Sequence, residues 1–218
     1  MPQPSFYRRY GKRWLDLSIA IPLALLLAPL MGALALIVRW RLGSPVLFSQ
    51  DRPGLAGRPF RMVKFRSMTD ARNEQGEFLS DDVRLTPLGR FLRASSLDEL
   101  PELWNVIRGE MSLVGPRPLL TAYLARYTPE QSKRHDILPG VTGWAQVNGR
   151  NAISWEEKFA YDVEYVERIS LRLDLRILRL TATKVILRKD VSAAGHVTMP
   201  EFRGNRCETG SRTEQDAA

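Results

Sequence analysis

A run of 22 residues without a charge, from Leu17 to Val38, constrains the fold of this chain more than any other feature. Its length alone is typical of a transmembrane helix. Pro22 and Pro29 interrupt the run, and a proline inside a helix removes a backbone donor and kinks or breaks the helix. Two halves of about 11 residues would rise roughly 16 Å each at 1.5 Å per residue, which is about half of the ~30 Å hydrocarbon core.

Basic residues flank both ends of this run: Arg8, Arg9, Lys12 and Arg13 before it, and Arg39 and Arg41 after it. Because positive charge tends to stay on the cytoplasmic side of a membrane, both ends are expected there. A re-entrant helix-break-helix, which enters one leaflet and returns, meets both constraints. A transmembrane span and a buried core helix are alternatives, whereas a signal peptide is disfavoured because the apolar core is too long and no small-residue cleavage site follows. Asp16, at the edge of the run, is expected to pair with Arg13 or to mark the membrane interface.

The overall composition points to one domain and an anionic partner. The chain has 218 residues, enough for one well-cored domain plus an appendage. Its formal net charge is +8, with 32 Lys and Arg against 24 Asp and Glu, which favours nucleic acid, phosphorylated small molecules or an acidic membrane face. The single cysteine, Cys207, excludes a disulfide framework and a cysteine-based metal site.

The rest of the chain predicts an α+β fold that is mostly helical. PVLFSQDRPG and GRPFRMVKFRSM are typical of two short strands joined by a Pro/Gly turn. Residues 70–86 are polar and charged and are predicted to form a loop. We expect a short helix at PLGRFLRA, a strand at WAQV, and helices at SWEEKFAYDVEYVER and LRLDLRILRLTATKVILRK. The expected regions are a re-entrant membrane hairpin over residues 1–42, a compact cytoplasmic domain over residues 43–203 and a disordered polar tail over residues 204–218.

The stretch SSLDELPELWNV contains three carboxylates, Asp98, Glu99 and Glu102, within five positions. Ser96 and Glu99 match a capping box, in which the serine caps a helix start and the glutamate bonds back to the cap. This account leaves Pro101 as the fifth helical residue, where it would cost a backbone hydrogen bond. Local pattern alone therefore favours capping but leaves chemistry open for these acids.

Basic residues near turns strengthen the chemical interpretation: Lys64, Arg66, Arg90, Arg93, Arg117 and Arg150. The planar fork of arginine suits phosphate oxygens, and Mg²⁺ is usually held by one or two carboxylates plus substrate phosphates. An aspartate can also act as a nucleophile toward phosphorus and form an acyl phosphate. His135 and His196 lack the spacing of a zinc site and are expected to be structural or on the surface.

Several stretches, in order along residues 8–204, together resemble the bacterial sugar transferases, also called monotopic phosphoglycosyl transferases. They are KRWLDL, the hydrophobic hairpin around Ala28 and Pro29, FSQDRPG, FRMVKFRSM, SLDELPELWNV, MSLVGPRPLL, RHDILPGVTGWAQVNGRN and the late LDL segment. Each is a weak signal alone, but together and in this order they are highly specific. The short chain, with ISWEEKFAYDVEYV and GHVT near its end, looks most like the small diacetylbacillosaminyl phosphate transferases that begin lipid-linked glycan assembly for protein glycosylation.

This resemblance implies an enzyme at the cytoplasmic face of the bacterial inner membrane, with no nucleic-acid partner. It would move a sugar phosphate from a UDP-sugar, UDP-diacetylbacillosamine or a related acetamido sugar, to undecaprenyl phosphate, and would release UMP with the help of Mg²⁺. On the family's motif, Asp98 would attack the β-phosphorus and form a covalent phospho-sugar enzyme, from which the lipid phosphate takes the sugar phosphate. Glu99 would assist with the metal or the incoming phosphate, so Asp98 and Glu99 are also the expected metal ligands, and Glu102 is left as structural.

The other residues that the resemblance implies are basic. Lys64, Arg93, Arg117 and Arg150 match basic positions of the family's motifs and are expected to contact phosphate or nucleotide. The sequence departs from the family at the membrane break, where Ala28 replaces the usual serine before Pro29. Two alternative functions remain: a non-catalytic basic module for a membrane surface or nucleic acid, and a metal-dependent phosphohydrolase that uses Asp98 as nucleophile.

Overall fold

The computed structural model describes residues 6–149, 153–187 and 201–204. Its helices are α1 (Lys12–Leu42), α2 (Asp81–Arg84), α3 (Pro87–Ala94), α4 (Glu102–Arg108), α5 (Pro129–Ser132), α6 (Trp144–Asn148), α7 (Trp155–Arg168) and α8 (Leu171–Leu187). Its strands are β1 (Leu47–Pro53), β2 (Pro59–Phe65), β3 (Ser112–Val114) and β4 (Gly140–Thr142). Short π or 3₁₀ segments complete the fold: η1 (Tyr7–Gly11), η2 (Leu55–Gly57), η3 (Leu97–Glu99), η4 (Thr121–Arg126) and η5 (Lys133–His135). The prediction of a mostly helical α+β fold is confirmed.

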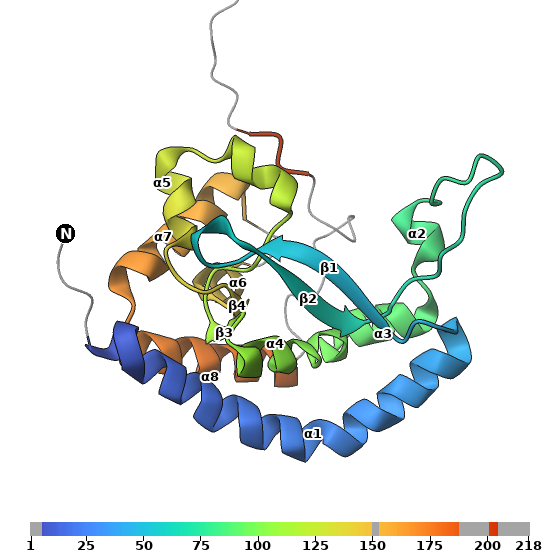
Figure 1. The fold of residues 1–218 in the computed structure, drawn as a ribbon, viewed down its shortest axis with the longest axis horizontal. Coiled ribbons are helices and arrows are strands. Elements are labelled where there is room, and N and C mark those ends of the chain that lie inside the picture. The colour runs from blue at the N-terminus through green and yellow to red at the C-terminus, as the bar shows by residue number, and fades with distance from the viewer. Residues whose placement is uncertain (1–5, 150–152, 188–200, 205–218) are drawn as a thin grey trace, which may run out of the picture.

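The apolar run forms one bent helix rather than two helices separated by a break. Both Pro22 and Pro29 lie inside α1, which is helical from Lys12 to Leu42 and bends near its middle (Figure 1). A proline removes one donor and kinks the helix, but the neighbouring turns keep their own hydrogen bonds. Ala28 and Pro29 therefore lie within a continuous helix, and the predicted helix-break-helix is wrong in this respect.

The outer face of α1 is strongly apolar and exposed. In the part of the chain that the structure describes, Tyr7–Leu42 is the one helical stretch long and apolar enough to cross a membrane, and only 11 % of its most apolar window is buried. Exposed side chains along it include Trp14, Ile21, Leu25, Leu26, Leu30, Leu36, Ile37 and Trp40. A core helix of a soluble protein would bury this surface, so the exposed face favours contact with lipid.

The inner face of α1 is held by a buried polar cluster at its N-terminal end. Lys12 Nζ lies 2.7 Å from Asp174 Oδ2 on α8 and donates to the Tyr165 hydroxyl on α7 at 3.0 Å. The hydroxyls of Tyr165 and Tyr7 each donate to Asp174 at 2.6 Å. Since Asp174 is fully buried, these donors replace the water that its carboxylate loses on folding.

Asp16, one turn further along α1, neither pairs with Arg13 nor lies at an exposed boundary of the apolar run. It is 2 % exposed and accepts hydrogen bonds from the Ser112 hydroxyl and the Leu113 backbone N–H of β3, both at 3.0 Å. Arg13 instead donates to the Val106 and Ile107 carbonyls at the end of α4. The expectation that Asp16 pairs with Arg13 or marks the interface is wrong, because the folded domain offers donors that local sequence does not reveal.

Two small sheets connect the helices. The predicted hairpin is confirmed: β1 pairs antiparallel with β2, from Leu47 opposite Phe65 to Pro53 opposite Pro59. The strand predicted at WAQV is wrong, because residues 144–147 lie in α6 and the strand β4 ends just before them. Strand β4 pairs in parallel with β3, and a Cβ on Gly140 would lie 2.0 Å from Gly115 N. The glycines therefore place the strand where two backbones must approach closely.

Several further predictions from the sequence are confirmed. Helix α3 matches PLGRFLRA, and α7 and α8 match the two amphipathic stretches. The predicted loop over residues 70–86 contains the single-turn helix α2 and the isolated bridge of Arg72 with Phe78, and a second bridge joins its Leu85 to Met68. Figure 1 shows α8, α4 and α3 lying beside the bent helix α1, with the β1–β2 hairpin and α5 further from it.

Replacement of Lys12 by methionine tests the buried cluster. Asp174 would then keep only hydroxyl donors in an apolar surrounding, so we expect a loss of about 3 kcal/mol in the free energy of unfolding. Arg9→Met, at an exposed position of η1, is the matched control and is expected to change stability by less than about 0.5 kcal/mol. Thermal unfolding of the full chain in lipid nanodiscs measures both, and equal melting temperatures of the two variants would contradict the role of the cluster.

Candidate active site

The three acids of SSLDELPELWNV lie where α3 ends and α4 begins. Ser96 has a left-handed backbone conformation (φ 56°), and its side chain makes no capping hydrogen bond. Residues Leu97–Glu99 then form the 3₁₀ turn η3, which packs on α3 and on β2. Helix α4 begins at Glu102, directly after Pro101. The predicted capping box of Ser96 and Glu99 is therefore wrong, because the proline delays the helix by several residues.

Asp98 is buried without a partner for its carboxylate. The residue is 7 % exposed, and among the described residues its side-chain oxygens accept no hydrogen bond and form no ion pair. Burial, and next the negative charge of Glu99, raise the pKa of Asp98. The positive charges of Lys64, Arg117 and Arg93 oppose this rise. Asp98 therefore presents an unengaged carboxylate surrounded by cations.

Glu99, in contrast, is fully engaged by cations. Its carboxylate accepts hydrogen bonds from Arg117, and Lys64 Nζ lies 3.1 Å from Oε1. Burial alone would raise the pKa of Glu99, but the Arg117 guanidinium and the Lys64 ammonium hold it well below the usual range. The same contact with Glu99 raises the pKa of Arg117 above its ordinary value. Glu99 is thus ionised and serves as the fixed counter-charge of both cations.

Glu102 belongs to the same cluster, although sequence reasoning set it aside as structural. It is 1 % exposed, and its Oε1 lies 3.0 Å from Lys64 Nζ. Lys64, on β2, therefore lies between two carboxylates. Burial, and next the charge of Glu99, raise the pKa of Glu102 to about 7. The spacing of three acids in five positions was the available signal, because residues one turn apart face the same side.

The remaining predicted basic residues divide into two groups. Arg93 on α3 donates to the Ser67 hydroxyl at 3.0 Å and contributes positive charge near Asp98. Arg66 and Arg90 hold backbone carbonyls of neighbouring segments and so have structural contacts. Arg150 lies outside the described residues. The structure therefore brings Lys64, Arg93 and Arg117 around the acids.

Three further basic residues near Arg117 were missed. Arg134 is buried, pairs with Asp162 at 2.8 Å and donates to the Arg117 carbonyl at 2.7 Å. Burial lowers the pKa of Arg52 on β1 and of Lys158 on α7, and the positive charge of Arg117 lowers both values further. Arg52 lies in FSQDRPG, so the family resemblance was the signal for it. Arg134 opens RHDILPGVTGWAQVNGRN and Lys158 lies in ISWEEKFAYDVEYV, so the same resemblance was available for them, and tertiary packing brings α7 and η5 together.

The described residues contain no group of three or more His, Cys, Asp and Glu that could hold a metal ion without a substrate. Mg²⁺ commonly uses one or two carboxylates and completes its shell with water and substrate phosphates. The free oxygens of Asp98 fit this requirement, whereas those of Glu99 are already occupied by Lys64 and Arg117. His135 is buried, and burial lowers its pKa to about 4, in line with its expected structural role.

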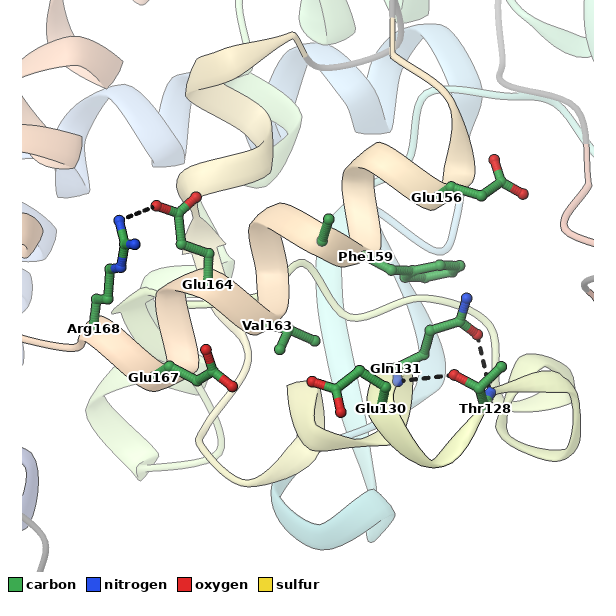
Figure 2. A pocket seen from close by; sticks show the side chains of 10 residues that line it. Thr128, Glu130, Gln131, Glu156, Phe159, Val163, Glu164, Glu167 and Arg168 are labelled. Atoms are coloured by element: carbon green, nitrogen blue, oxygen red, sulfur yellow. Dashed lines mark hydrogen bonds and ion pairs between the residues drawn. The ribbon is translucent and has the colours of Figure 1, made fainter. Parts of the chain in front are cut away.

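A surface hollow lies elsewhere, between α5 and α7 (Figure 2). The residues that line it are Thr128, Glu130, Gln131, Glu156, Phe159, Ala160, Val163, Glu164, Glu167 and Arg168. It shares no residue with the cluster around Asp98. Its four glutamates repel phosphate, so the hollow does not fit a phosphorylated substrate.

The clustered acids and cations match what comparison with known proteins finds. A family model described as bacterial sugar transferase matches residues 7–188. The chain belongs to the bacterial sugar transferase family. This confirms the resemblance to the bacterial sugar transferase family and the expectation of a transferase, while the finer resemblance to diacetylbacillosaminyl phosphate transferases stays a prediction.

Curated relatives of this sugar transferase agree with the family match. The chain is 52 % identical over 194 residues to an uncharacterized sugar transferase, EpsL, of Bacillus subtilis (strain 168). The matched region covers 89 % of this chain and 96 % of that protein. It is 42 % identical to a UDP-glucose:undecaprenyl-phosphate glucose-1-phosphate transferase of Xanthomonas campestris pv. campestris, over 80 % of this chain and 38 % of that protein. It is also 42 % identical to a UDP-galactose-lipid carrier transferase of Erwinia amylovora, over 84 % of this chain and 41 % of that protein. The chain thus spans about two fifths of the length of these last two relatives.

The raised pKa of Glu102 predicts a pH dependence of stability. Between its usual pKa of 4.5 and its raised pKa of about 7, the Glu102 side chain is protonated more in the folded protein than in the unfolded chain. The free energy of unfolding therefore falls as pH rises through this range. Glu102→Gln removes this effect. Between pH 5 and pH 8, we expect the free energy of unfolding of the variant to rise by up to about 3 kcal/mol relative to that of the native protein.

Melting temperatures of the full chain across this pH range measure the effect. Glu74→Gln, at an exposed position of the 70–86 loop, is the matched control and should run parallel to the native protein. Parallel curves for native protein and Glu102→Gln would show that Glu102 does not titrate in this range.

Proposed function

We propose that this chain transfers a sugar phosphate from a UDP-sugar to undecaprenyl phosphate and releases UMP. The observation that carries the proposal is the buried Asp98 carboxylate, which has no partner among the described residues and is surrounded by Lys64, Arg93 and Arg117. A nucleophile toward phosphorus needs free lone pairs, and the anionic phosphates around it need positive charge. Relatives named for this reaction support the substrate classes.

In the proposed reaction, an Asp98 oxygen attacks the β-phosphorus of the UDP-sugar. The bond from that phosphorus to the bridging oxygen breaks, and UMP leaves with the electron pair. The resulting acyl phosphate joins Asp98 to the sugar phosphate. An oxygen of undecaprenyl phosphate then attacks the same phosphorus, which frees the Asp98 carboxylate and forms the lipid-linked diphosphate sugar. One carboxylate in two half-reactions avoids aligning both large substrates at once.

The surrounding residues would act by charge and position. Lys64, Arg93 and Arg117 offset the charge of the phosphates, and Arg150 is proposed to join them in contact with phosphate or nucleotide. Glu99 fixes Lys64 and Arg117 through its hydrogen bonds. Bound Mg²⁺, proposed to be held by Asp98 and Glu99 with the substrate phosphates, would supply further neutralisation of the diphosphate. Because Glu99 already holds two cations, its contribution requires Lys64 or Arg117 to shift when substrate binds.

We further propose that α1 is re-entrant, so that the protein is monotopic on the cytoplasmic face of the bacterial inner membrane. Its bend, its exposed apolar face and the basic residues at both ends support this arrangement. The lipid phosphate lies at the membrane surface, and a helix that enters and leaves on one side keeps the catalytic domain beside it. Cytoplasmic placement also agrees with the domain's basic charge, which favours anionic headgroups.

The choice of sugar is part of the proposal. The motif resemblance favours UDP-diacetylbacillosamine or a related acetamido sugar, whereas relatives carry the names of glucose and galactose transferases. A panel of these three UDP-sugars with undecaprenyl phosphate, followed by UMP release, decides among them. Release of UMP with all three at equal rates would contradict a preference for the acetamido sugar.

Asp98→Asn tests the nucleophile in the same assay. The amide keeps the size of the side chain but cannot form the acyl phosphate, so we expect UMP release to fall at least about 1,000-fold. Asp82→Asn, at an exposed position of α2, is the matched control and should retain full activity. Full activity of Asp98→Asn would exclude the proposed transferase mechanism, and free sugar phosphate formed without lipid would indicate a phosphohydrolase instead.

Cysteine labelling tests the topology. Single cysteines are placed at Tyr10 and Gly43, just beyond the two ends of α1, in a chain whose Cys207 is replaced by serine. A re-entrant helix predicts that an impermeant thiol reagent labels both positions in inside-out vesicles and neither in intact spheroplasts. Labelling of the two positions from opposite faces would mean that α1 spans the membrane.

A further inference from the structure

Arg52 is a half-buried cation with no counter-ion. It lies next to the last residue of β1, and its Nε is buried without a hydrogen-bond partner in the described structure. One terminal nitrogen donates to Gln50 Oε1 at 2.7 Å, but no carboxylate of the described chain forms an ion pair with it. A guanidinium removed from water in this way is unfavourable unless an anion completes its surroundings.

The charges near Arg52 make this imbalance larger. After burial itself, the largest influence that lowers the pKa of Arg52 is the positive charge of Arg117. Arg117 has its own carboxylate, Glu99, and Arg134 has Asp162. Arg52 is therefore the guanidinium of this group whose charge is not matched by a carboxylate contact. Two guanidinium groups whose charges repel each other, of which only Arg117 has a carboxylate contact among the described residues, form a site that attracts an anion.

The position of Arg52 indicates which anion. Strand β1 follows α1 in the chain and runs away from its end, and the hairpin turn η2 at the far end of β1 packs on η5 (Figure 1). Arg52 lies five residues along this strand from Leu47, about 17 Å at ~3.3 Å per residue. With α1 placed in the membrane as proposed, a lipid phosphate approaches from the side of α1, which leaves the far end of β1 for the nucleotide.

We propose that Arg52, together with Arg117, binds the phosphate group that leaves with the nucleotide. This inference rests on the proposed function. When the bond to the β-phosphorus breaks, the bridging oxygen keeps the electron pair and the departing UMP carries an additional negative charge. Arg117 contacts Glu99 next to the reacting carboxylate, and Arg52, beyond it, meets the α-phosphate on which this charge develops.

Binding of UMP to the full chain in nanodiscs tests the proposal without any sugar. A hydrogen bond to a charged group supports at least about a tenfold change in affinity, so we expect the Kd of UMP to rise at least about tenfold in Arg52→Gln. Arg61→Gln, on the paired strand β2, is the matched control. The Arg61 side chain is exposed and, within the described part of the chain, donates a hydrogen bond only to the Ser49 hydroxyl. The Kd of UMP for Arg61→Gln should therefore stay within about twofold of the value for the native protein.

Steady-state kinetics then separate the two phosphate sources. We expect the KM of the UDP-sugar to rise in Arg52→Gln with the KM of undecaprenyl phosphate unchanged. A rise confined to undecaprenyl phosphate would place the lipid phosphate at Arg52 and overturn the proposal, as would an unchanged Kd of UMP. If Arg52→Gln does not fold, Arg52→Lys keeps the charge but loses the fork, and native affinity for UMP in that variant also overturns the proposal. Failure of the proposed function is distinct from these results, because the native protein itself would then neither bind nor release UMP.

Discussion

The buried contacts between α1 and the rest of the chain fix the position of this apolar helix relative to the cluster around Asp98. Lys12 pairs with Asp174, and Asp16 accepts hydrogen bonds from β3. Gly115-Pro116-Arg117 directly follows β3, and the guanidinium of Arg117 binds Glu99. The strand that α1 holds is therefore the strand that places Arg117. Since the outer face of α1 requires an apolar surrounding, these contacts also set how the cluster faces the lipid.

Within the cluster, unequal partners give three nearby carboxylates three different properties. Glu99 holds Lys64 and Arg117 and stays ionised, and Glu102 shares Lys64 in a buried position that raises its pKa. Asp98 keeps its oxygens free because both cations are already held by its neighbours. In the proposed reaction, Lys64 and Arg117 can therefore assist a phosphorylated substrate without neutralising Asp98, the proposed nucleophile, through direct contact.

Sequence predicted those features that depend on local pattern. The apolar spacing in SWEEKFAYDVEYVER located α7, and the Pro/Gly turn located the hairpin of β1 and β2. Local pattern failed where a distant contact decides. Asp16 bonds to residues about a hundred positions away, β4 lies where Gly140 meets Gly115, and Ser96 does not cap because Pro101 displaces the helix. The motif resemblance supplied Asp98 and Glu99, but the pairing of Lys64 with Glu102 and the unmatched charge of Arg52 require the folded chain.

The most direct test of the central claim is isotope exchange in the absence of lipid. If Asp98 forms a covalent phospho-sugar, labelled UMP incubated with the native protein and its unlabelled UDP-sugar will enter the UDP-sugar pool without undecaprenyl phosphate. The Asp98→Asn protein will show no exchange. Exchange that requires undecaprenyl phosphate, or that persists in Asp98→Asn, would contradict the account, because the sugar phosphate would then pass directly between the two substrates.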